Sequence, residues 1–144
     1  ASVTAHGAAI DPAFAEYDDI DTAVVVLRFV SGALGVIDNS RSARYGYECS
    51  TEVMGTLATA RIDAPHPRGL EWRSRGGAVR GFARDFEERF PFAYVAELDA
   101  FARCVRDGTP PRVTGHDALV ASDLAAAATE SWRTGRTVSL EVPA

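Results

Sequence analysis

The hydrophobic pattern of the chain changes period near Phe82, and this change constrains the fold more than any other feature. Before Phe82, short apolar segments alternate with polar residues and are separated by turn-forming residues, as in half-buried strands. After Phe82, apolar residues recur at steps of three and four, which is typical of amphipathic helices. Strands followed by helices favour an α+β fold over one in which the two alternate.

The part before Phe82 predicts a series of strands. The clearest pair is 22–29 and 33–41, two segments joined by a turn at Ser31-Gly32, which is a hairpin pattern. The second segment changes from apolar to polar halfway, so we expect its polar end at an edge or a cleft. Segment 11–19 is predicted to be an irregular connection, and Pro65-His66-Pro67 a break. Further strands are expected at 3–10, 48–54, 57–63, 69–75 and 78–82.

The part after Phe82 predicts two long helices. The first begins near Pro91 and is capped by Gly108. The second covers Ala118–Trp132, with a capping box at Thr114-x-x-Asp117 and a stop at Gly135. A final strand is expected at 137–142. The predicted fold is a single domain, 1–144, with an open, predominantly antiparallel or mixed sheet of six or seven strands and both helices on one face. Its bare face is an expected oligomer interface.

Composition excludes several classes of function. All 15 basic residues are arginine, so no lysine chemistry is available, and the net charge of −5 argues against a nucleic-acid or polybasic membrane surface. The longest apolar run, 23–27, is too short to span a bilayer. Neither a Gly-x-Gly-x-x-Gly turn nor a Walker loop occurs, and the histidines lack zinc-site spacing. For Cys49 and Cys104, two reduced thiols in a cytosolic protein are favoured over a disulfide.

Two segments carry side chains suited to ligand binding. Segment 38–48 contains Asn39, Arg41, Tyr45 and Tyr47, whose amide, guanidinium and phenol groups suit a polyhydroxylated ligand. On chemistry alone, a polar hairpin end with a tyrosine packed on a helix is the favoured interpretation. Segment 82–90 contains Phe86 among charged residues, and ordinary buried and exposed helix faces are favoured there. Tyr94 is either a core aromatic or a cleft wall.

The order of several motifs resembles the C-terminal part of a known family. Ile37-Asp38-Asn39-Ser40-Arg41, Tyr45-Gly46-Tyr47-Glu48 and Glu52-Val53-Met54-Gly55-Thr56 are followed by Arg89-Phe90, Ala93-Tyr94-Val95 and Asp107-Gly108-Thr109-Pro110-Pro111. This order is similar to that of the glucose–fructose oxidoreductase / inositol dehydrogenase / MocA family, in particular inositol 2-dehydrogenases. Each motif is modest, but their joint order and spacing are fairly specific.

The resemblance implies an enzyme of which this chain is one part. Members of the family begin with a Rossmann domain that binds the dinucleotide, and carry a Glu-Lys-Pro motif and an Asp-x-x-x-His segment, none of which occurs here. The chain also opens at Ala1 without methionine. The expectation is therefore a C-terminal substrate-binding and oligomerisation domain, inactive alone, without its Rossmann domain. The whole enzyme would be a cytoplasmic homodimer or homotetramer that transfers hydride from a CH–OH group of myo-inositol, or a related cyclic polyol or sugar, to NAD or NADP.

The same resemblance implies a set of substrate contacts. Tyr47 matches the second tyrosine of the family's Tyr-Gly-Tyr motif and would bind a substrate hydroxyl, with Tyr45 lining the same pocket. Tyr94 matches a tyrosine near the active-site cleft, and Phe86 stands where some inositol dehydrogenases have tryptophan. Asn39 and Arg41 are further candidate contacts. No catalytic, cofactor-binding or metal-binding residue is expected in this chain. The alternative is a stand-alone module for small-ligand binding or dimerisation, without catalysis.

Overall fold

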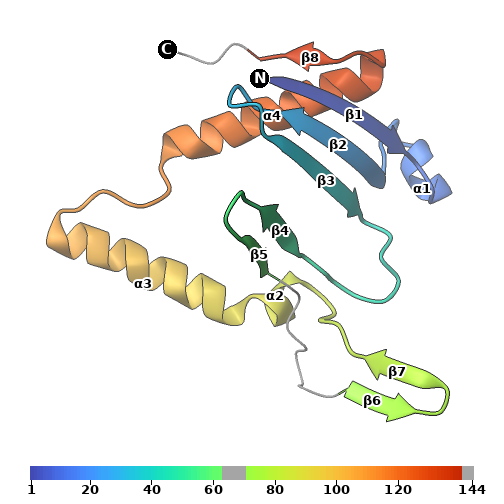
Figure 1. Ribbon diagram of the computed structural model, residues 1–144, viewed down its shortest axis with the longest axis horizontal. Coiled ribbons are helices and arrows are strands. Elements are labelled where there is room, and N and C mark those ends of the chain that lie inside the picture. Colours follow the sequence, from blue (N-terminus) through green and yellow to red (C-terminus); the bar gives the residue numbers. More distant parts are fainter. Residues whose placement is uncertain (63–70, 141–144) are drawn as a thin grey trace. The chain divides into compact units, whose positions relative to one another are not determined.

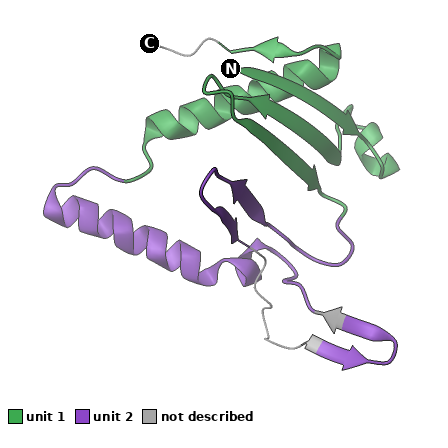
Figure 2. Cartoon of the chain, viewed as in Figure 1, with its two compact units in different colours: residues 1–42, 112–144 green, residues 43–111 purple. Residues whose placement is uncertain are grey.

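A computed structural model describes residues 1–62 and 71–140 of the chain (Figure 1). The chain divides into two compact units, one formed by 1–42 with 112–144 and the other by 43–111 (Figure 2). The predicted break at Pro65-His66-Pro67 lies outside the described residues, as do Asp63, Gly69, Leu70 and the end of the predicted last strand at 141–142.

The first unit is built on a four-stranded antiparallel sheet in the order β3-β2-β1-β8. The strands are β1 (Ser2–Ala8), β2 (Thr22–Arg28), β3 (Leu34–Ser40) and β8 (Val138–Ser139). Strands β2 and β3 form the predicted hairpin, with Val25 opposite Ile37. Residues on one face of a strand recur every second position. The partners Val3 and Leu27 therefore share a face with Ala5 and Val25.

That face is covered by helix α4 (Gly115–Thr134) (Figure 1). Val3 and Ala5 of β1 are buried, as are Ala127 and Ser131 of α4. The Ser131 hydroxyl accepts a hydrogen bond of 2.9 Å from the backbone N–H of Ala5. Strand β8 pairs with β1 only at Ser2 and Val3, so the helix supplies an acceptor where the neighbouring strand has ended.

A close approach between sheet and helix requires glycine at position 7. A Cβ atom there would lie 3.2 Å from Cδ1 of Trp132 and still closer to the side chain of Ile20. Larger residues would have to displace the indole. Beyond β8, the N–H of Leu140 donates to the carbonyl O of Ala1 at 2.9 Å, so the start of β1 lies beside the end of β8.

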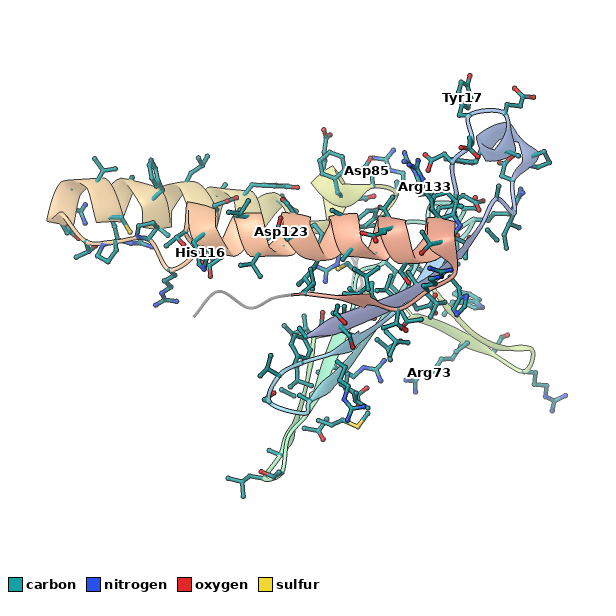
Figure 3. All side chains as sticks on the ribbon, turned by 90° about the horizontal axis from the view of Figure 1, so that it is seen from above. Tyr17, Arg73, Asp85, His116, Asp123 and Arg133 are labelled. Atoms are coloured by element: carbon teal, nitrogen blue, oxygen red, sulfur yellow. The ribbon has the colours of Figure 1, made fainter. Side chains whose placement is uncertain are left out.

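The predicted capping box of α4 is confirmed. The Asp117 carboxylate accepts from the backbone N–H of Thr114 at 2.7 Å, and the Thr114 hydroxyl accepts from the N–H of Asp117 at 3.5 Å. The Thr114 N–H, and then the Thr114 hydroxyl, which donates to the same carboxylate at 2.8 Å, lower the pKa of Asp117. Gly135 ends the helix in the left-handed conformation, as predicted. Figure 3 shows His116 and Arg133 near the two ends of α4, with Asp123 between them.

The connection between β1 and β2 corrects one prediction. Segment 11–19 was expected to be irregular, but it contains a helical turn, α1 (Pro12–Ala15). The physical signals are present in the sequence, because Asp11 caps the turn by accepting from the N–H of Ala13 at 3.1 Å and proline occupies the first helical position.

Asp21, which is only 3% exposed, links the same connection to the end of β3. Its carboxylate accepts from the Ser42 hydroxyl at 2.7 Å and from the backbone N–H groups of Ile10 at 2.8 Å and Asp11 at 3.0 Å. These donors favour the charged form, so the Ser42 hydroxyl and then the Ile10 N–H lower the pKa of Asp21 to about 2.

The second unit consists of two hairpins and two helices. Strand β4 (Thr51–Met54) pairs with β5 (Thr59–Ile62), and β6 (Glu71–Ser74) pairs with β7 (Gly77–Arg80), both antiparallel. The short helix α2 (Phe86–Arg89) leads into α3 (Pro91–Asp107). As predicted, Pro91 lies in the first turn of α3 and Gly108 caps its end.

The α+β class is confirmed, but the predicted sheet is wrong in detail. The described residues form three sheets, of four, two and two strands, instead of one sheet of six or seven. The same described residues form four helices: α3 and α4 are the two long ones that were predicted, and α1 and α2 are short ones that were not. Alternating hydrophobicity predicts that a segment is a strand, but it does not say which strands pair beyond a local hairpin. Among the described residues, no helix is long and apolar enough to cross a membrane.

Candidate functional site

The Tyr-Gly-Tyr motif is attached to a distant segment of the second unit. The backbone N–H of Tyr47 donates to the carbonyl O of Ala83 at 2.7 Å, in an isolated antiparallel bridge. Between the tyrosines, Gly46 has a φ of 127°, and a Cβ atom there would lie 2.5 Å from the carbonyl O of Ala83. Only glycine permits this approach without strain. The Tyr45 ring lies 4.9 Å from that of Phe82.

Four aromatic residues follow one another at steps of four in this second segment, and we call Phe82, Phe86, Phe90 and Tyr94 the aromatic row. The row makes three ring contacts. Besides the Tyr45–Phe82 pair, Phe90 meets Tyr47 edge-on at 6.1 Å, and Phe86 meets Tyr94 edge-on at 6.4 Å. Such tilted and edge-on contacts are favourable for aromatic pairs. The row therefore organises both tyrosines of the Tyr-Gly-Tyr motif.

The candidate ligand-binding rings remain partly accessible. Tyr47 is 36% exposed, Tyr94 46%, Phe86 49% and Tyr45 60%. A partly exposed tyrosine presents an apolar ring and a hydroxyl that donates and accepts hydrogen bonds. Side chains of this kind are chemically suited to a small molecule that has both apolar faces and hydroxyl groups.

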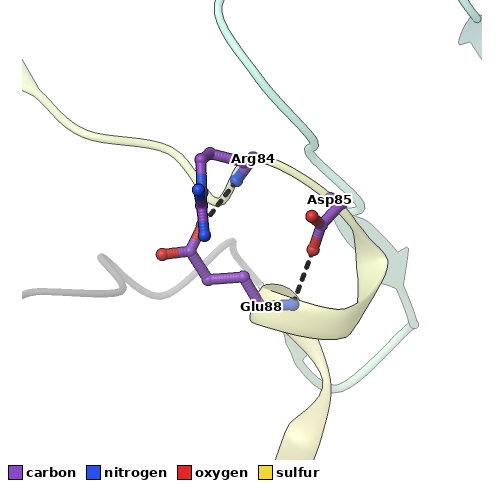
Figure 4. Close-up of polar contacts among 3 residues, drawn as sticks. All are labelled: Arg84, Asp85 and Glu88. Carbon is purple, nitrogen blue, oxygen red and sulfur yellow. Dashed lines mark hydrogen bonds and ion pairs between the residues drawn. The ribbon is translucent and has the colours of Figure 1, made fainter.

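The turn that carries Phe86 and leads to Phe90 is held by reciprocal hydrogen bonds (Figure 4). The Asp85 carboxylate accepts from the backbone N–H of Glu88 at 2.8 Å. The Glu88 carboxylate in turn accepts from the backbone N–H of Arg84 at 2.8 Å and from its Nε at 3.3 Å. Together these bonds satisfy backbone donors at the start of α2.

The next residue along the turn, Arg89, connects the aromatic row to the chain that follows Tyr47. Its guanidinium carbon lies 4.5 Å from the centre of the Phe90 ring, and its Nη2 donates to the carbonyl O of Cys49 at 3.5 Å. Both cysteines, Cys49 and Cys104, are free thiols.

The structure brings together part of the predicted residue set. Tyr45 and Tyr47 contact members of the aromatic row, and Phe86 contacts Tyr94, all within the second unit. Asn39 and Arg41 belong to the first unit, at the end of β3 and just after it. Asn39 is exposed opposite Ala23, and the guanidinium of Arg41 lies 5.5 Å from the centre of the Phe14 ring.

Sequence reasoning missed three residues of this cluster: Phe82, Phe90 and Arg89. Two of them were detectable, because aromatic residues at 82, 86, 90 and 94 recur at a constant step of four. The position of Arg89 beside Cys49 could not be detected, because it depends on the pairing of Tyr47 with Ala83.

The fold and this cluster define a class of domain. It is an α+β chain with an antiparallel sheet covered by one long helix, and with a row of partly exposed aromatic side chains, but without a dinucleotide-binding turn in its sequence. Residues 1–140 match the family described as "Oxidoreductase family, C-terminal alpha/beta domain". The chain belongs to this family, as its motif order indicated.

Two relatives and one solved structure show what this chain is similar to. A myo-inositol 2-dehydrogenase of Thermotoga maritima is 44% identical over 138 residues, 92% of this chain and 40% of the relative. The scyllo-inositol 2-dehydrogenase (NAD(+)) of Bacillus subtilis is 38% identical over 142 residues, 98% of this chain and 42% of the relative. The crystal structure of a myo-inositol dehydrogenase from Corynebacterium glutamicum superposes with a TM-score of 0.90 at 35% identity, covering 99% of this chain and 44% of that one. The chain thus spans about two-fifths of the length of these relatives.

Proposed function

We propose that this chain is the substrate-side and assembly domain of a longer, cytoplasmic NAD(P)-dependent dehydrogenase. The enzyme oxidises a CH–OH group of myo-inositol or a related cyclic polyol or sugar. The observation that carries the proposal is the pairing of the Tyr-Gly-Tyr motif with the aromatic row, in a chain whose relatives are inositol dehydrogenases.

The chemistry of the cluster suits a cyclic polyol. Such a molecule has C–H groups on the faces of its ring and hydroxyls around the rim. Aromatic rings such as Phe86 pack against the C–H faces, and the phenols of Tyr47, Tyr45 and Tyr94 exchange hydrogen bonds with the hydroxyls. Asn39, at the polar end of β3, and Arg41, just after it, are proposed as further contacts.

The residues of this chain do not fit the nicotinamide cofactor. The sequence has no Gly-x-Gly-x-x-Gly turn, and it has no lysine. We therefore assign cofactor binding and proton transfer to a separate Rossmann domain of the longer protein, and binding of the polyol partly to this chain.

The test is a turnover assay on the longer protein. With myo-inositol and NAD or NADP it should produce reduced nicotinamide, whereas the 144-residue chain alone should produce none. Turnover by the isolated chain would contradict the division of roles. No turnover of any cyclic polyol or sugar by the longer protein would favour a binding or dimerisation module without catalysis.

Tyr47 is the contact to test first. The substitution Tyr47→Phe removes the hydroxyl and keeps the ring against Phe90. Loss of one hydrogen bond should cost about 0.5–1.5 kcal/mol, seen as a raised KM or a lowered kcat by a modest factor. Unchanged values of both parameters would remove Tyr47 from the site.

We also propose that the longer protein is a homodimer or homotetramer assembled through the bare face of the four-stranded sheet. The register places Val24 and Val26 of β2 and Val36 of β3 on the face opposite Val3 and Ala5, and all three valines are exposed. A contiguous exposed apolar face on a sheet is characteristic of an interaction surface.

Sedimentation tests the assembly. A charge in the face, Val26→Asp, should shift the protein toward monomer, because burying an unpaired carboxylate is costly. Val113→Asp makes the same change at an exposed valine outside the sheet and should leave the mass unchanged. A wild-type protein that stays strictly monomeric at high concentration would refute the proposal.

A further inference from the structure

Two contacts of Arg89 lie close to Tyr47. Its guanidinium covers the ring of Phe90, which itself meets Tyr47 edge-on. A hydrogen bond from its Nη2 goes to the carbonyl O of Cys49, two residues after Tyr47 along the chain. Arg89 is half-buried, and its position in α2 is set by the backbone bond from its N–H to the carbonyl O of Asp85 at 3.1 Å.

We propose that Arg89 is a positioning residue that holds Tyr47 in the orientation needed to bind the polyol. The proposal rests on the proposed function, since it takes Tyr47 as a substrate contact. Arg89 acts from two sides: it fixes the ring against which Tyr47 packs, and it fixes the backbone that follows Tyr47.

The guanidinium group suits both tasks at once. It is planar, so it lies over an aromatic face while its N–H groups point outward in the plane toward an acceptor. A lysine ammonium is a compact charge without this planar fork and cannot reproduce both contacts equally well.

The turn that carries Arg89 is fixed independently of Tyr47. Asp85 and Glu88 hold it through the bonds to the N–H groups of Glu88 and Arg84 (Figure 4). Arg89 therefore projects from a braced turn toward the Tyr-Gly-Tyr segment, whose own attachment to Ala83 is a single backbone bridge. Arg89 braces this segment through the ring of Phe90 and through the backbone at Cys49, just after Tyr47.

The first experiment measures the ring of Tyr47 in the 144-residue chain by aromatic NMR. Phe90, edge-on at 6.1 Å, shifts the ring signals of Tyr47, and Arg89→Met should move these signals toward free-tyrosine positions. Arg103→Met makes the same change at an exposed arginine of α3 and should leave them in place. Arg89→Lys covers the case in which the Met variant does not fold, and it should shift them in the same direction by less. Wild-type signals in both Arg89 variants would overturn the proposal.

The second experiment measures kinetics in the longer protein. Arg89→Met should raise the KM for myo-inositol about three- to tenfold with kcat nearly unchanged, the factor expected for the loss of one hydrogen bond in binding. Because Arg89 acts through the Tyr47 hydroxyl, the double variant with Tyr47→Phe should have a KM no higher than Tyr47→Phe alone. If the KM increases of the two single variants multiplied in the double variant, the proposal would be overturned. If the wild-type protein does not turn over the polyol, the proposed function fails, while the NMR result still decides whether Arg89 orients Tyr47.

Discussion

The two units of the chain are stabilised by different kinds of interaction. The first has a sheet of long strands against a long helix, with Val3 and Ser131 fully buried between them. The second has two short hairpins, a capped turn and ring contacts, and Ala83 is its buried apolar residue among the described positions. The comparison indicates that the first unit should resist local opening more strongly than the second unit, which carries Tyr45, Tyr47, Phe86 and Tyr94.

The largest effect is expected at the bridge between Tyr47 and Ala83. Gly46→Ala places a Cβ against the Ala83 carbonyl and forces alanine into a φ of 127°, which together should destabilise the second unit by about 3 kcal/mol. Hydrogen exchange should show loss of protection at the Tyr47 amide, with the β1 and β2 amides unchanged.

Gly81→Ala is the matched control, because a Cβ at Gly81 meets no atom within 4 Å. Loss of protection in both units after Gly46→Ala would mean that they unfold together and would break the comparison.

A smaller effect is expected at the helix–sheet contact of the first unit. Ser131→Ala leaves the buried N–H of Ala5 without its acceptor and should lower the free energy of unfolding by about 2 kcal/mol, measured by urea denaturation. Ser122→Ala, on the exposed side of the same helix, should change it little, since its hydroxyl bonds only to the Ala118 carbonyl one turn away. Equal effects would show that the burial of Ser131 is unimportant.

The cap of α4 should contribute less. Thr114→Ala removes the hydroxyl that accepts from Asp117 and should cost about 1 kcal/mol by the same assay. Thr129→Ala removes a hydroxyl that bonds to Ala125 within the helix, and it serves as the control. A Thr114→Ala variant as stable as wild type would show that the capping box is dispensable.

The smallest effect, the contribution of the Asp21 carboxylate to stability, changes only at acidic pH. The pKa of Asp21 is about 2 in the fold, below the usual 3.8, so its carboxylate stabilises the first unit above pH 3.8, and this contribution is lost as the pH falls toward 2. The urea midpoint should decline over that range, and the carboxyl carbon of Asp21 should titrate near pH 2 by NMR. Titration of Asp21 near pH 3.8 would show that the hydrogen bonds from Ser42 and Ile10 do not lower its pKa.

Local signals in the sequence predicted the features that depend on neighbouring residues. The caps at Thr114, Gly108 and Gly135 were predicted because capping needs particular residues at fixed offsets. The β2–β3 hairpin was predicted because its turn adjoins both strands. The turn α1 carries the same kind of signal at Asp11 and Pro12, so it too was predictable from the sequence.

Features that join distant segments could not be predicted in this way. Nothing near Tyr47 indicates that Ala83 is its partner, and nothing near Ala5 indicates that its N–H bonds to Ser131. Consequently the residue types of the candidate site were predictable, whereas the contacts of Tyr45 and Tyr47 with Phe82 and Phe90 were not.

The hydrogen bonds between Ala1 and Leu140 have a consequence for protein architecture. These bonds place the start of β1 and the residue that follows β8 side by side, so residues 1 and 140 of the first unit are close together in space. A domain with adjoining ends can be inserted into another chain, or rearranged by circular permutation, without stretching its sheet. A permuted chain that joins these two ends should keep the pairing of β1 with β8, with residues 43–111 still inserted between the two parts of the first unit.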